Sequence, residues 1–297
     1  MAQPINDRNG IDQNVSELPI DCDIIFSDYE NIYKKRVEKR QTKLLQKISF
    51  IKPFLEEGEK IFLVTTGCSP MSIMEQFTMR RSALYIKQSL FVFTNKRIFH
   101  IPTKSNYTYR NSIAQILYAD CQTIEMNWRS LVVKYKNGKK EKFQYIPINE
   151  GQKIKELLKT IALEGVQSNT ACRTHLCPRC TKELIEDDYT CPHCRLEFKN
   201  KAEARRFSII YPGGGYFYTG HPWSGVVVGF IESGSLISVV INLVEALQGV
   251  YEHYFISLIR IGFPLVMFAL VKISTIYYSN LFIEEYIPKE TEIKPIQ

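Results

Sequence analysis

Four cysteines form the pattern with the most specific chemistry in this sequence. Cys177-Pro-Arg-Cys180 is followed, after ten residues, by Cys191-Pro-His-Cys194. Two CxxC turns across a short hairpin direct four thiolates at one ion, and Zn²⁺ accepts four thiolates in a tetrahedron. The spacing therefore predicts a four-cysteine Zn²⁺ site. Because four protein ligands leave no open position for water or substrate, we expect the metal to be structural.

Other uses of these cysteines stay open from sequence alone. Disulfides or a redox CxxC would use the same residues, and an iron centre of rubredoxin type would take the same ligands. Cys172, His175 and His193 are near enough in sequence to replace a ligand. The first ten residues, MAQPINDRNG, carry no signal-peptide pattern, so we expect a reducing compartment, which favours a metal over disulfides.

The segment 172–198 resembles a small zinc ribbon, with LIEDDYT as the hairpin that connects the two turns. In many ribbons Gly follows each CxxC because φ is positive there, whereas this chain has Thr181 and Arg195. Some 30 residues hold too small a core to fold alone, so metal binding would supply the free energy of folding. The hairpin is acidic, which argues against a nucleic-acid partner although ribbons can have one. The acidic residues are Glu183, Glu186, Asp187 and Asp188.

Two charged residues interrupt long apolar stretches near the C-terminus. Glu232 is the one charge in 224–243, and Lys272 is the one charge in 261–283. Each stretch reaches the roughly 20 residues that cross a hydrocarbon core. The alternative is a buried helical hairpin of a soluble protein. In an antiparallel hairpin the two charges lie at similar depth, and an isolated charge in hydrocarbon is costly. We therefore expect them to pair within the hairpin or across an oligomer, and a double charge swap to rescue the single swaps.

Small residues recur every fourth position in the first apolar stretch, at Gly225, Gly229 and Ser233. Such a row lets helix backbones approach closely, which predicts a packing face or a dimer face. The alternative is that glycine is simply common in membrane helices.

The stretch 211–225, YPGGGYFYTGHPWSG, is rich in glycine. Gly215 and Gly220 have P-loop spacing, but His221-Pro222 follows where that loop needs Lys and Ser or Thr, which argues against a phosphate site. The stretch resembles the entry of TM2-like membrane domains, and the likeness covers about 205–283. The resemblance uses Pro212, Gly213, Gly215, Tyr218, Gly220 and Gly225. It implies a tight turn before a spanning helix and says little about function. We expect 205–220 to be interfacial or re-entrant, because it is too short to span.

The rest of the chain must form the elements that present these sites. We expect a loose leader over residues 1–28. Residues 29–56 should form a basic amphipathic helix whose charged face meets either solvent or anionic lipid. Short β-type runs follow, Asn137-Gly138 signals a type I′ hairpin turn, and 149–164 reads as an amphipathic helix. The β-type runs are 60–66, 89–94, 96–102, 130–136 and 140–146.

This layout resembles the bacterial PH-like and GRAM-like domains over about 55–165. The likeness is carried by LEEGEKIFLVTTG, LFVFTNKRIFHIP, SIAQILYADCQTIEM and SLVVKYKNGKKEKF. The resemblance implies a binding or assembly module with no catalytic residue. Arg80 and Arg81 fall near the hairpin where eukaryotic PH domains bind phosphoinositides, but two loop arginines are typical of solvated surface.

The expected fold class is multidomain: a PH-like antiparallel β-barrel with a C-terminal helix (57–165), a small zinc ribbon (172–198), an α-helical transmembrane hairpin (205–285) and a tail (286–297). More basic residues precede the first span than separate the two, which predicts a multi-pass inner-membrane protein with its N-terminal domains in the cytoplasm. These basic residues are Lys199, Lys201, Arg205 and Arg206.

The sequence contains no nucleophile–base pair, open metal site or cofactor loop, so no catalysis is expected. A scaffold or sensor is the first functional hypothesis, with the lipid bilayer, other proteins bound through the PH-like domain, and a second copy of the chain as partners. A small channel or transporter subunit using Glu232 and Lys272 is the alternative, as is a membrane-tethered nucleic-acid binder.

Overall fold

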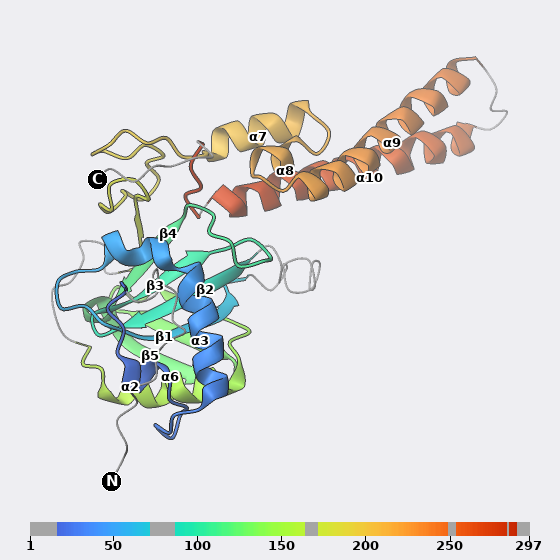
Figure 1. Cartoon of the computed structure of the whole chain (residues 1–297). Helices are drawn as coiled ribbons and strands as arrows, with labels where there is room; N and C mark the ends of the chain where they lie inside the picture. Colours follow the sequence, from blue (N-terminus) through green and yellow to red (C-terminus); the bar gives the residue numbers. More distant parts are fainter. Residues whose placement is uncertain (1–16, 72–86, 164–171, 249–253, 284, 290–297) are drawn as a thin grey trace, which may run out of the picture. The chain divides into compact units, whose positions relative to one another are not determined.

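The computed structural model describes residues 17–71, 87–163, 172–248, 254–283 and 285–289, and the chain divides into two compact units (Figure 1). The first comprises Met1–Asp188, Pro192–Cys194 and Ile293–Gln297, and the second comprises Tyr189–Cys191 and Arg195–Glu292. The boundary runs through the cysteine-rich segment. Arg80 and Arg81 lie outside the described residues.

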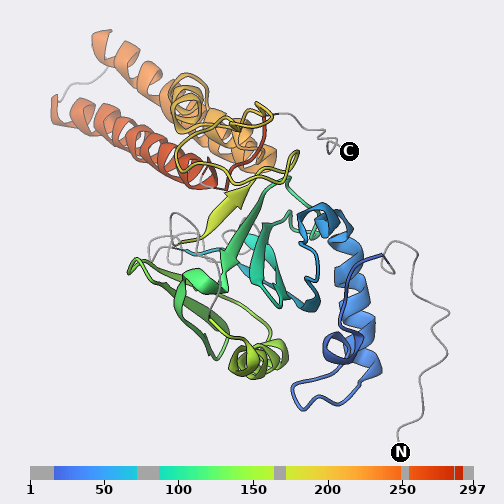
Figure 2. The same ribbon diagram turned by 90° about the vertical axis from the view of Figure 1, so that its left-hand side faces the viewer.

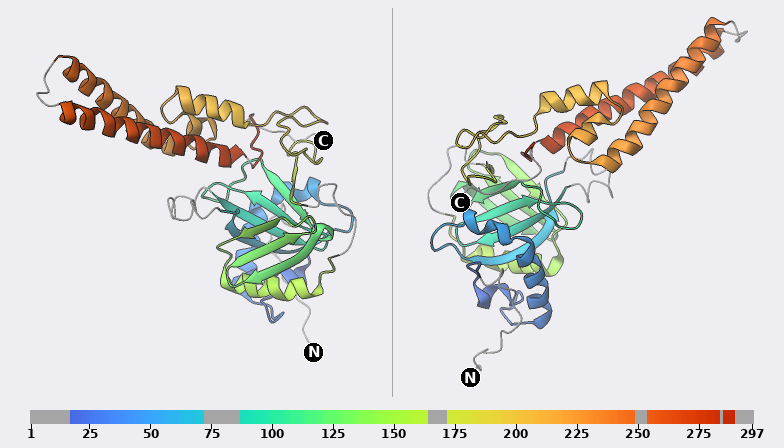
Figure 3. Two further views of the ribbon diagram at one scale, coloured as in Figure 1. Left: turned by 180° about the vertical axis from the view of Figure 1, so that it is seen from behind. Right: turned by 45° about the horizontal axis from the view of Figure 1, so that its top comes forward.

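The first unit is built on two antiparallel sheets (Figure 3). The larger has the order β1-β2-β3-β4-β8, formed by β1 (Ile61–Cys68), β2 (Gln88–Thr94), β3 (Arg97–Pro102), β4 (Ile113–Leu117) and β8 (Thr174–Leu176). The smaller has the order β5-β6-β7, formed by β5 (Cys121–Asn127), β6 (Ser130–Tyr135) and β7 (Lys140–Phe143). All five runs predicted from the sequence overlap a strand, and β6 and β7 flank the predicted Asn137-Gly138 turn.

Neither sheet closes into a barrel among the described residues, so the expected closed β-barrel is not found. A single antiparallel bridge, Cys68 to Gln144, joins the end of β1 to the residue after β7. The five-stranded sheet is instead buried on both faces, which explains why its strands read as nearly continuous apolar runs. On β2, Leu90 and Val92 face one core cluster while Phe91 and Phe93 face the other.

Helices cover the outer face of the five-stranded sheet (Figure 2). They are α2 (Cys22–Ile25), α3 (Lys35–Lys47) and the 3₁₀ helix η1 (Ser49–Phe54). The apolar face of α3 is therefore inside the protein, with Leu45 and Ile48 fully buried, so it is not available for lipid. On the opposite side of the unit, α6 (Ile148–Thr160) packs through Ile154 against the core shared by the two sheets.

The N-terminal boundaries differ from those predicted. Residues 17–28 are not a loose leader, because α2 buries Ile25 and its N-cap Asp21 accepts a hydrogen bond from the Ile24 N–H. The basic helix begins at Lys35 rather than at residue 29. Asp28 Oδ1 accepts the N–H groups of residues 30 and 32 in a turn, and Asn31 has a φ of 59°, which no helix continues.

The second unit contains two long apolar helices that run antiparallel side by side (Figure 1). They are α9 (Pro222–Leu247) and α10 (Tyr254–Ile283), and both are long and apolar enough to cross a membrane. Their mean hydropathies are 1.9 and 1.7, and only 6% of each apolar window is buried. These are the two spans expected from the sequence, each extended by a few residues.

The region 205–220 forms two short helices with a glycine-rich turn between them. The first is α7 (Lys201–Ile210), whose N-cap Asn200 accepts the Glu203 N–H at 2.7 Å. The second is α8 (Gly214–Tyr218), which starts after Pro212-Gly213. Pro212 lacks an N–H and Gly213 adopts a φ of 65°, so α7 cannot continue through the turn.

Candidate metal centre and buried ion pair

Each CxxC turn is held by the same backbone hydrogen bonds, and we call the two turns the first knuckle (176–183) and the second knuckle (190–197). In the first, the Cys177 N–H donates to Lys182 O at 2.8 Å and the Thr181 N–H to Cys177 O at 2.9 Å. In the second, the Cys191 N–H donates to Leu196 O at 2.9 Å and the Arg195 N–H to Cys191 O at 2.9 Å.

The two knuckles form an internal repeat of fourteen residues that was not predicted from the sequence. Antiparallel bridges join Leu176 to Glu183 and Thr190 to Glu197, at equivalent positions. Both Thr181 and Arg195 adopt positive φ, 61° and 57°, as glycine would in many ribbons. The chain thus adopts the knuckle geometry without glycine. The two Cys-Pro-x-Cys motifs, which have the same spacing, are the sequence signal that indicates the repeat.

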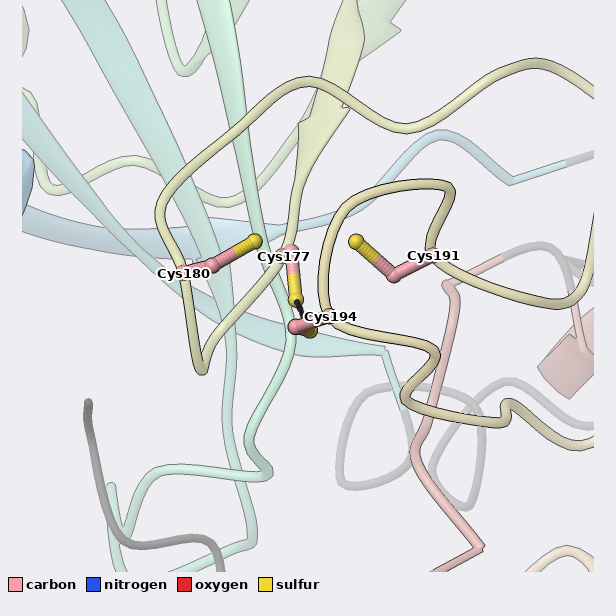
Figure 4. A group of neighbouring side chains, drawn as sticks. All are labelled: Cys177, Cys180, Cys191 and Cys194. Carbon is pink, nitrogen blue, oxygen red and sulfur yellow. Dashed lines mark hydrogen bonds between the residues drawn. The ribbon is translucent and has the colours of Figure 1, made fainter.

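The four sulfur atoms converge on one point (Figure 4). The Sγ atoms of Cys177, Cys180, Cys191 and Cys194 all lie within 4.8 Å of one another, and those of Cys177 and Cys194 are 3.5 Å apart. A tetrahedral ion with metal–sulfur bonds of about 2.3 Å separates its ligand sulfurs by about 3.8 Å. No disulfide joins these four cysteines. The arrangement fits a metal ion of tetrahedral preference.

The residues considered as replacement ligands are not part of this group. Among the described residues, the cluster holds four cysteines, without Cys172, His175 or His193. His175 lies in β8, where it pairs with Ala114 of β4. The complete set of four thiolates leaves no place for a histidine nitrogen.

A different neighbouring segment holds each knuckle. In the first unit β8 pairs with β4 directly before Cys177, and Gln115 on β4 donates to Glu183 Oε1 at 2.7 Å. In the second unit the segment after α10 lies along the second knuckle, where the Lys199 N–H donates to Ile287 O and the Lys289 N–H to Glu197 O. The tail predicted for 286–297 is therefore ordered against the knuckle over 286–289.

The two charges of the apolar helices lie together inside the second unit. Lys272 Nζ on α10 is 2.8 Å from Glu232 Oε2 on α9, the pairing expected from the sequence within one hairpin. Glu232 has no exposed surface, and the Lys272 side chain is 14% exposed. Glu232 also accepts the Thr275 hydroxyl at 2.9 Å, and Lys272 donates to the backbone oxygen of Ser208 at 2.7 Å.

The glycine-rich turn completes the surroundings of the carboxylate. The backbone N–H of Gly213 donates to Glu232 Oε2 at 2.9 Å. A Cβ atom at Gly213 would lie 2.0 Å from Gly225 O, and one at Gly215 would lie 2.1 Å from Ser208 Oγ. Only glycine fits these positions, so the turn is a close-packed backbone contact that presents an N–H to Glu232.

The row of small residues in α9 packs within the chain. A Cβ at Gly225 would be 3.0 Å from the Phe217 ring, and one at Gly229 would be 3.2 Å from Pro212 O. Gly225 and Gly229 thus receive the turn and α8, and Ser233 is half-buried one turn further along. Tyr218 of the same motif donates its hydroxyl to Glu203 at 2.6 Å, and Gly220 has a φ of 83°.

The surroundings of His100 were not predicted from the sequence. Its Nε2 lies 2.9 Å from Ser69 Oγ and 3.1 Å from Ser89 Oγ, in the interior of the first unit. Its Nδ1 lies 3.0 Å from Arg173 Nη1, and Arg173 Nε donates to Glu141 Oε1 at 3.0 Å. Because a guanidinium only donates, Nδ1 must accept and Nε2 carries the proton.

This tautomer decides what His100 can do. A serine nucleophile needs an unprotonated Nε2 to take its proton, and here Nε2 donates instead. Burial, followed by the charges of Arg173 and Lys87, lowers the pKa of His100 well below its usual value, so the ring is neutral at neutral pH. The Ser–His contact is thus a buried polar network between strands and not an activated nucleophile.

No family model, curated protein or solved structure matches this chain.

Proposed function

We propose that this protein is a membrane-anchored scaffold or sensor whose first unit acts as a cytosolic PH-like binding module. The observation that carries the proposal is the exposed apolar surface of α9 and α10. Phe230 on α9 and Phe263 on α10 are 75% and 69% exposed. A helical hairpin in the core of a soluble protein would bury such residues, whereas lipid accommodates them.

The order of elements supports a PH-like module. Seven strands, β1 to β7, form antiparallel pairs and are followed directly by the amphipathic helix α6. This agrees with the resemblance carried by the LEEGEK and TNKR segments. The module would bind proteins or lipids through its surface, because its interior is filled by two apolar clusters.

The metal would be Zn²⁺ in a structural role. Four thiolates suit this ion, and a closed shell offers no site to a substrate. When bound, it would fix the two knuckles on each other. The cysteines need a reducing environment, which agrees with a cytoplasmic position of the ribbon and the first unit at the bacterial inner membrane.

The surroundings of Glu232 and Lys272 favour an anchoring hairpin over a channel. An ion or proton pathway needs charged groups with water or a vacant coordination position beside them. Glu232 instead has Lys272, Thr275 and the Gly213 N–H as partners. We infer that the pair stabilises the hairpin.

Membrane extraction combined with protease accessibility tests this proposal. The full chain should stay in the bacterial membrane pellet after alkaline carbonate and enter solution only with detergent. Protease added to inverted vesicles should digest the first unit, while protease added to intact spheroplasts should not. Release by carbonate would refute membrane anchoring, and digestion in spheroplasts would refute the cytosolic orientation.

A matched pair of variants sharpens the extraction test. Phe230→Lys places a charge on the exposed face of α9 and should release the chain or lower its insertion. Trp128→Lys, at an equally exposed aromatic residue of the β5–β6 hairpin, should leave extraction unchanged, since Trp128 is 79% exposed in the first unit.

A further inference from the structure

The solvent face of α3 carries a row of lysines at every fourth position. Lys35, Lys39, Lys43 and Lys47 are all exposed, while the opposite face of the helix is buried against the five-stranded sheet. With a rise of 1.5 Å per residue, successive members are about 6 Å apart along the axis and the row is about 18 Å long. Figure 2 shows α3 on the outside of the first unit.

These four lysines have no ion pair or hydrogen bond with any described residue. The neighbouring cations differ in this respect, because Lys34 lies 2.6 Å from Asp28 and Arg40 lies 2.5 Å from Glu150. The single acidic residue of the helix, Glu38, accepts the Tyr33 hydroxyl. The row is therefore an uncompensated strip of positive charge on the exposed face of α3.

A second observation lies at the start of the same helix. Tyr29, Ile32 and Tyr33 are 40%, 53% and 50% exposed in the turn that precedes α3. Exposed aromatic and aliphatic side chains beside a basic strip are the combination that binds the headgroup zone of a bilayer, where rings and aliphatic groups enter the interface and cations meet lipid phosphates.

We propose that the outer face of α3 binds the surface of an anionic bilayer through this lysine row, with the 29–33 turn entering the headgroup zone. Charge complementarity selects an anionic partner. Ile32, which cannot stack on a base, and the apolar helices α9 and α10 of the same chain favour lipid over nucleic acid. The choice of lipid rests on the proposed membrane anchoring. The first unit would then be held against the surface rather than left free beside it.

The test measures lysine reactivity in the full chain. The protein is reconstituted into vesicles of phosphatidylcholine, with or without phosphatidylglycerol, and treated with an amine-acylating reagent, and mass spectrometry gives the rate at each lysine. We expect Lys35, Lys39, Lys43 and Lys47 to react at least about fivefold more slowly with phosphatidylglycerol present, the factor that one lysine at a charged surface contributes. High salt should remove the protection.

Internal controls lie on the three-stranded sheet. Lys134 and Lys142 are exposed on β6 and β7, and their rates should be the same in both vesicles. Equal rates at the α3 lysines in both vesicles would overturn the proposal. Equal or stronger protection by a single-stranded oligonucleotide, added to phosphatidylcholine vesicles, would overturn it in favour of a nucleic-acid partner.

A double variant tests the row itself. Lys35→Gln with Lys39→Gln removes half the row at exposed positions without partners, and Gln keeps helix propensity, so the fold is retained. Protection of Lys43 and Lys47 should fall. The matched variant Lys134→Gln with Lys142→Gln should not change it. Undiminished protection after the α3 substitutions would show that the row does not make the contact. Carbonate extraction tests the membrane anchoring independently of lysine protection. A chain that carbonate releases can still be tested for lipid-dependent protection of the α3 lysines, so failure of one proposal is distinguished from failure of the other.

Discussion

The carboxylate of Glu232 accepts the backbone N–H of Gly213 at 2.9 Å, although nineteen residues separate them in sequence. The same carboxylate lies 2.8 Å from Lys272 Nζ, and that ammonium also donates to Ser208 O. The two charges thus interact with different polar groups as well as with each other. Around Glu232 the partners are donors, and around Lys272 they are carbonyl oxygens, so the two sites are not interchangeable.

The double charge swap Glu232→Lys with Lys272→Glu should therefore fail to rescue the single swaps. A lysine at 232 would face the Gly213 N–H, and a glutamate at 272 would face the carbonyl oxygens of Ser208 and Tyr211. The rescue expected from the sequence considered only the mutual attraction of the two charges, and the swap experiment decides between the two predictions. Breaking a buried pair costs on the order of 3–5 kcal/mol, measurable by reversible unfolding in mixed detergent micelles.

The neutral pair Glu232→Gln with Lys272→Met is the control for this experiment. Glutamine keeps an acceptor for the Gly213 N–H, and no charge remains unpaired, so the double variant should be more stable than either single charge reversal. Full recovery in the swapped protein would show that the directional partners contribute nothing.

Gly213→Ala should destabilise the second unit strongly, because the added Cβ would lie 2.0 Å from Gly225 O and Gly213 has a φ of 65°. We expect a loss above about 2 kcal/mol, since both backbone strain and a steric clash with the backbone result. Gly234→Ala, with nothing within 4 Å of the added Cβ, is the matched control. It should be neutral or stabilising by up to about 1 kcal/mol in detergent unfolding. Equal effects at both positions would contradict the close-packed turn.

The sequence predicts the elements of this protein better than it predicts their partners. Apolar length identifies α9 and α10, and β-type runs identify five of the eight strands in the described part of the chain, because these signals are local. β8 escapes detection since it is only three residues long, Thr174–Leu176, and adds to the sheet across a long separation from β4. Sheet closure is likewise non-local, so the sequence could not show that neither sheet closes into a barrel among the described residues.

The side-chain partners of the TNKR segment likewise cannot be predicted from the sequence. Thr94 Oγ1 donates to Glu59 Oε1 at 2.7 Å, and Arg97 Nη2 lies 2.7 Å from Glu59 Oε2. Lys96 pairs with Glu56 at 2.9 Å. The segments EEGE and TNKR, which both help to carry the family resemblance, therefore contact each other through these hydrogen bonds and ion pairs. Sequence alone shows that both are present, while their contact depends on the β1–β2–β3 register.

Removing single cluster cysteines should lower bound metal, whereas removing other cysteines should not. Cys180→Ser or Cys194→Ser leaves three thiolates, which hold a tetrahedral ion more weakly. Cys22→Ser and Cys172→Ser change half-buried cysteines outside the cluster and serve as controls. Elemental analysis of the purified full chain should give about one Zn per chain for the native protein and both controls. Iron in place of zinc would keep the site and change its identity, and a metal-free native protein would refute the centre.

Glycine at a strained knuckle position should strengthen metal binding by the four cysteines. Thr181 and Arg195 have φ values of 61° and 57°, a conformation that costs a β-branched residue such as Thr181 on the order of 1–2 kcal/mol. Thr181→Gly should therefore slow zinc loss to a competing chelator. Lys182→Gly is the matched control, because Lys182 is not among the residues of positive φ. It should speed zinc loss or leave it unchanged. The same acceleration in both variants would mean that the strain at Thr181 is negligible.

The first unit should lose stability as pH falls below about 6.5, the ordinary pKa of histidine, and His100 should account for part of that loss. Burial lowers the folded-state pKa of His100, so between that value and 6.5 the unfolded chain binds the extra proton. Stability then decreases with falling pH by up to about 1.4 kcal/mol per pH unit. His100→Gln, which keeps an amide N–H toward Ser69 and Ser89 but does not titrate, should flatten this slope in thermal unfolding between about pH 6.5 and 5. Any metal held by the cysteines would also be released at low pH, and equally in both proteins, so the difference in slope isolates His100. Parallel slopes would assign the whole acid effect to other groups, the metal ligands among them.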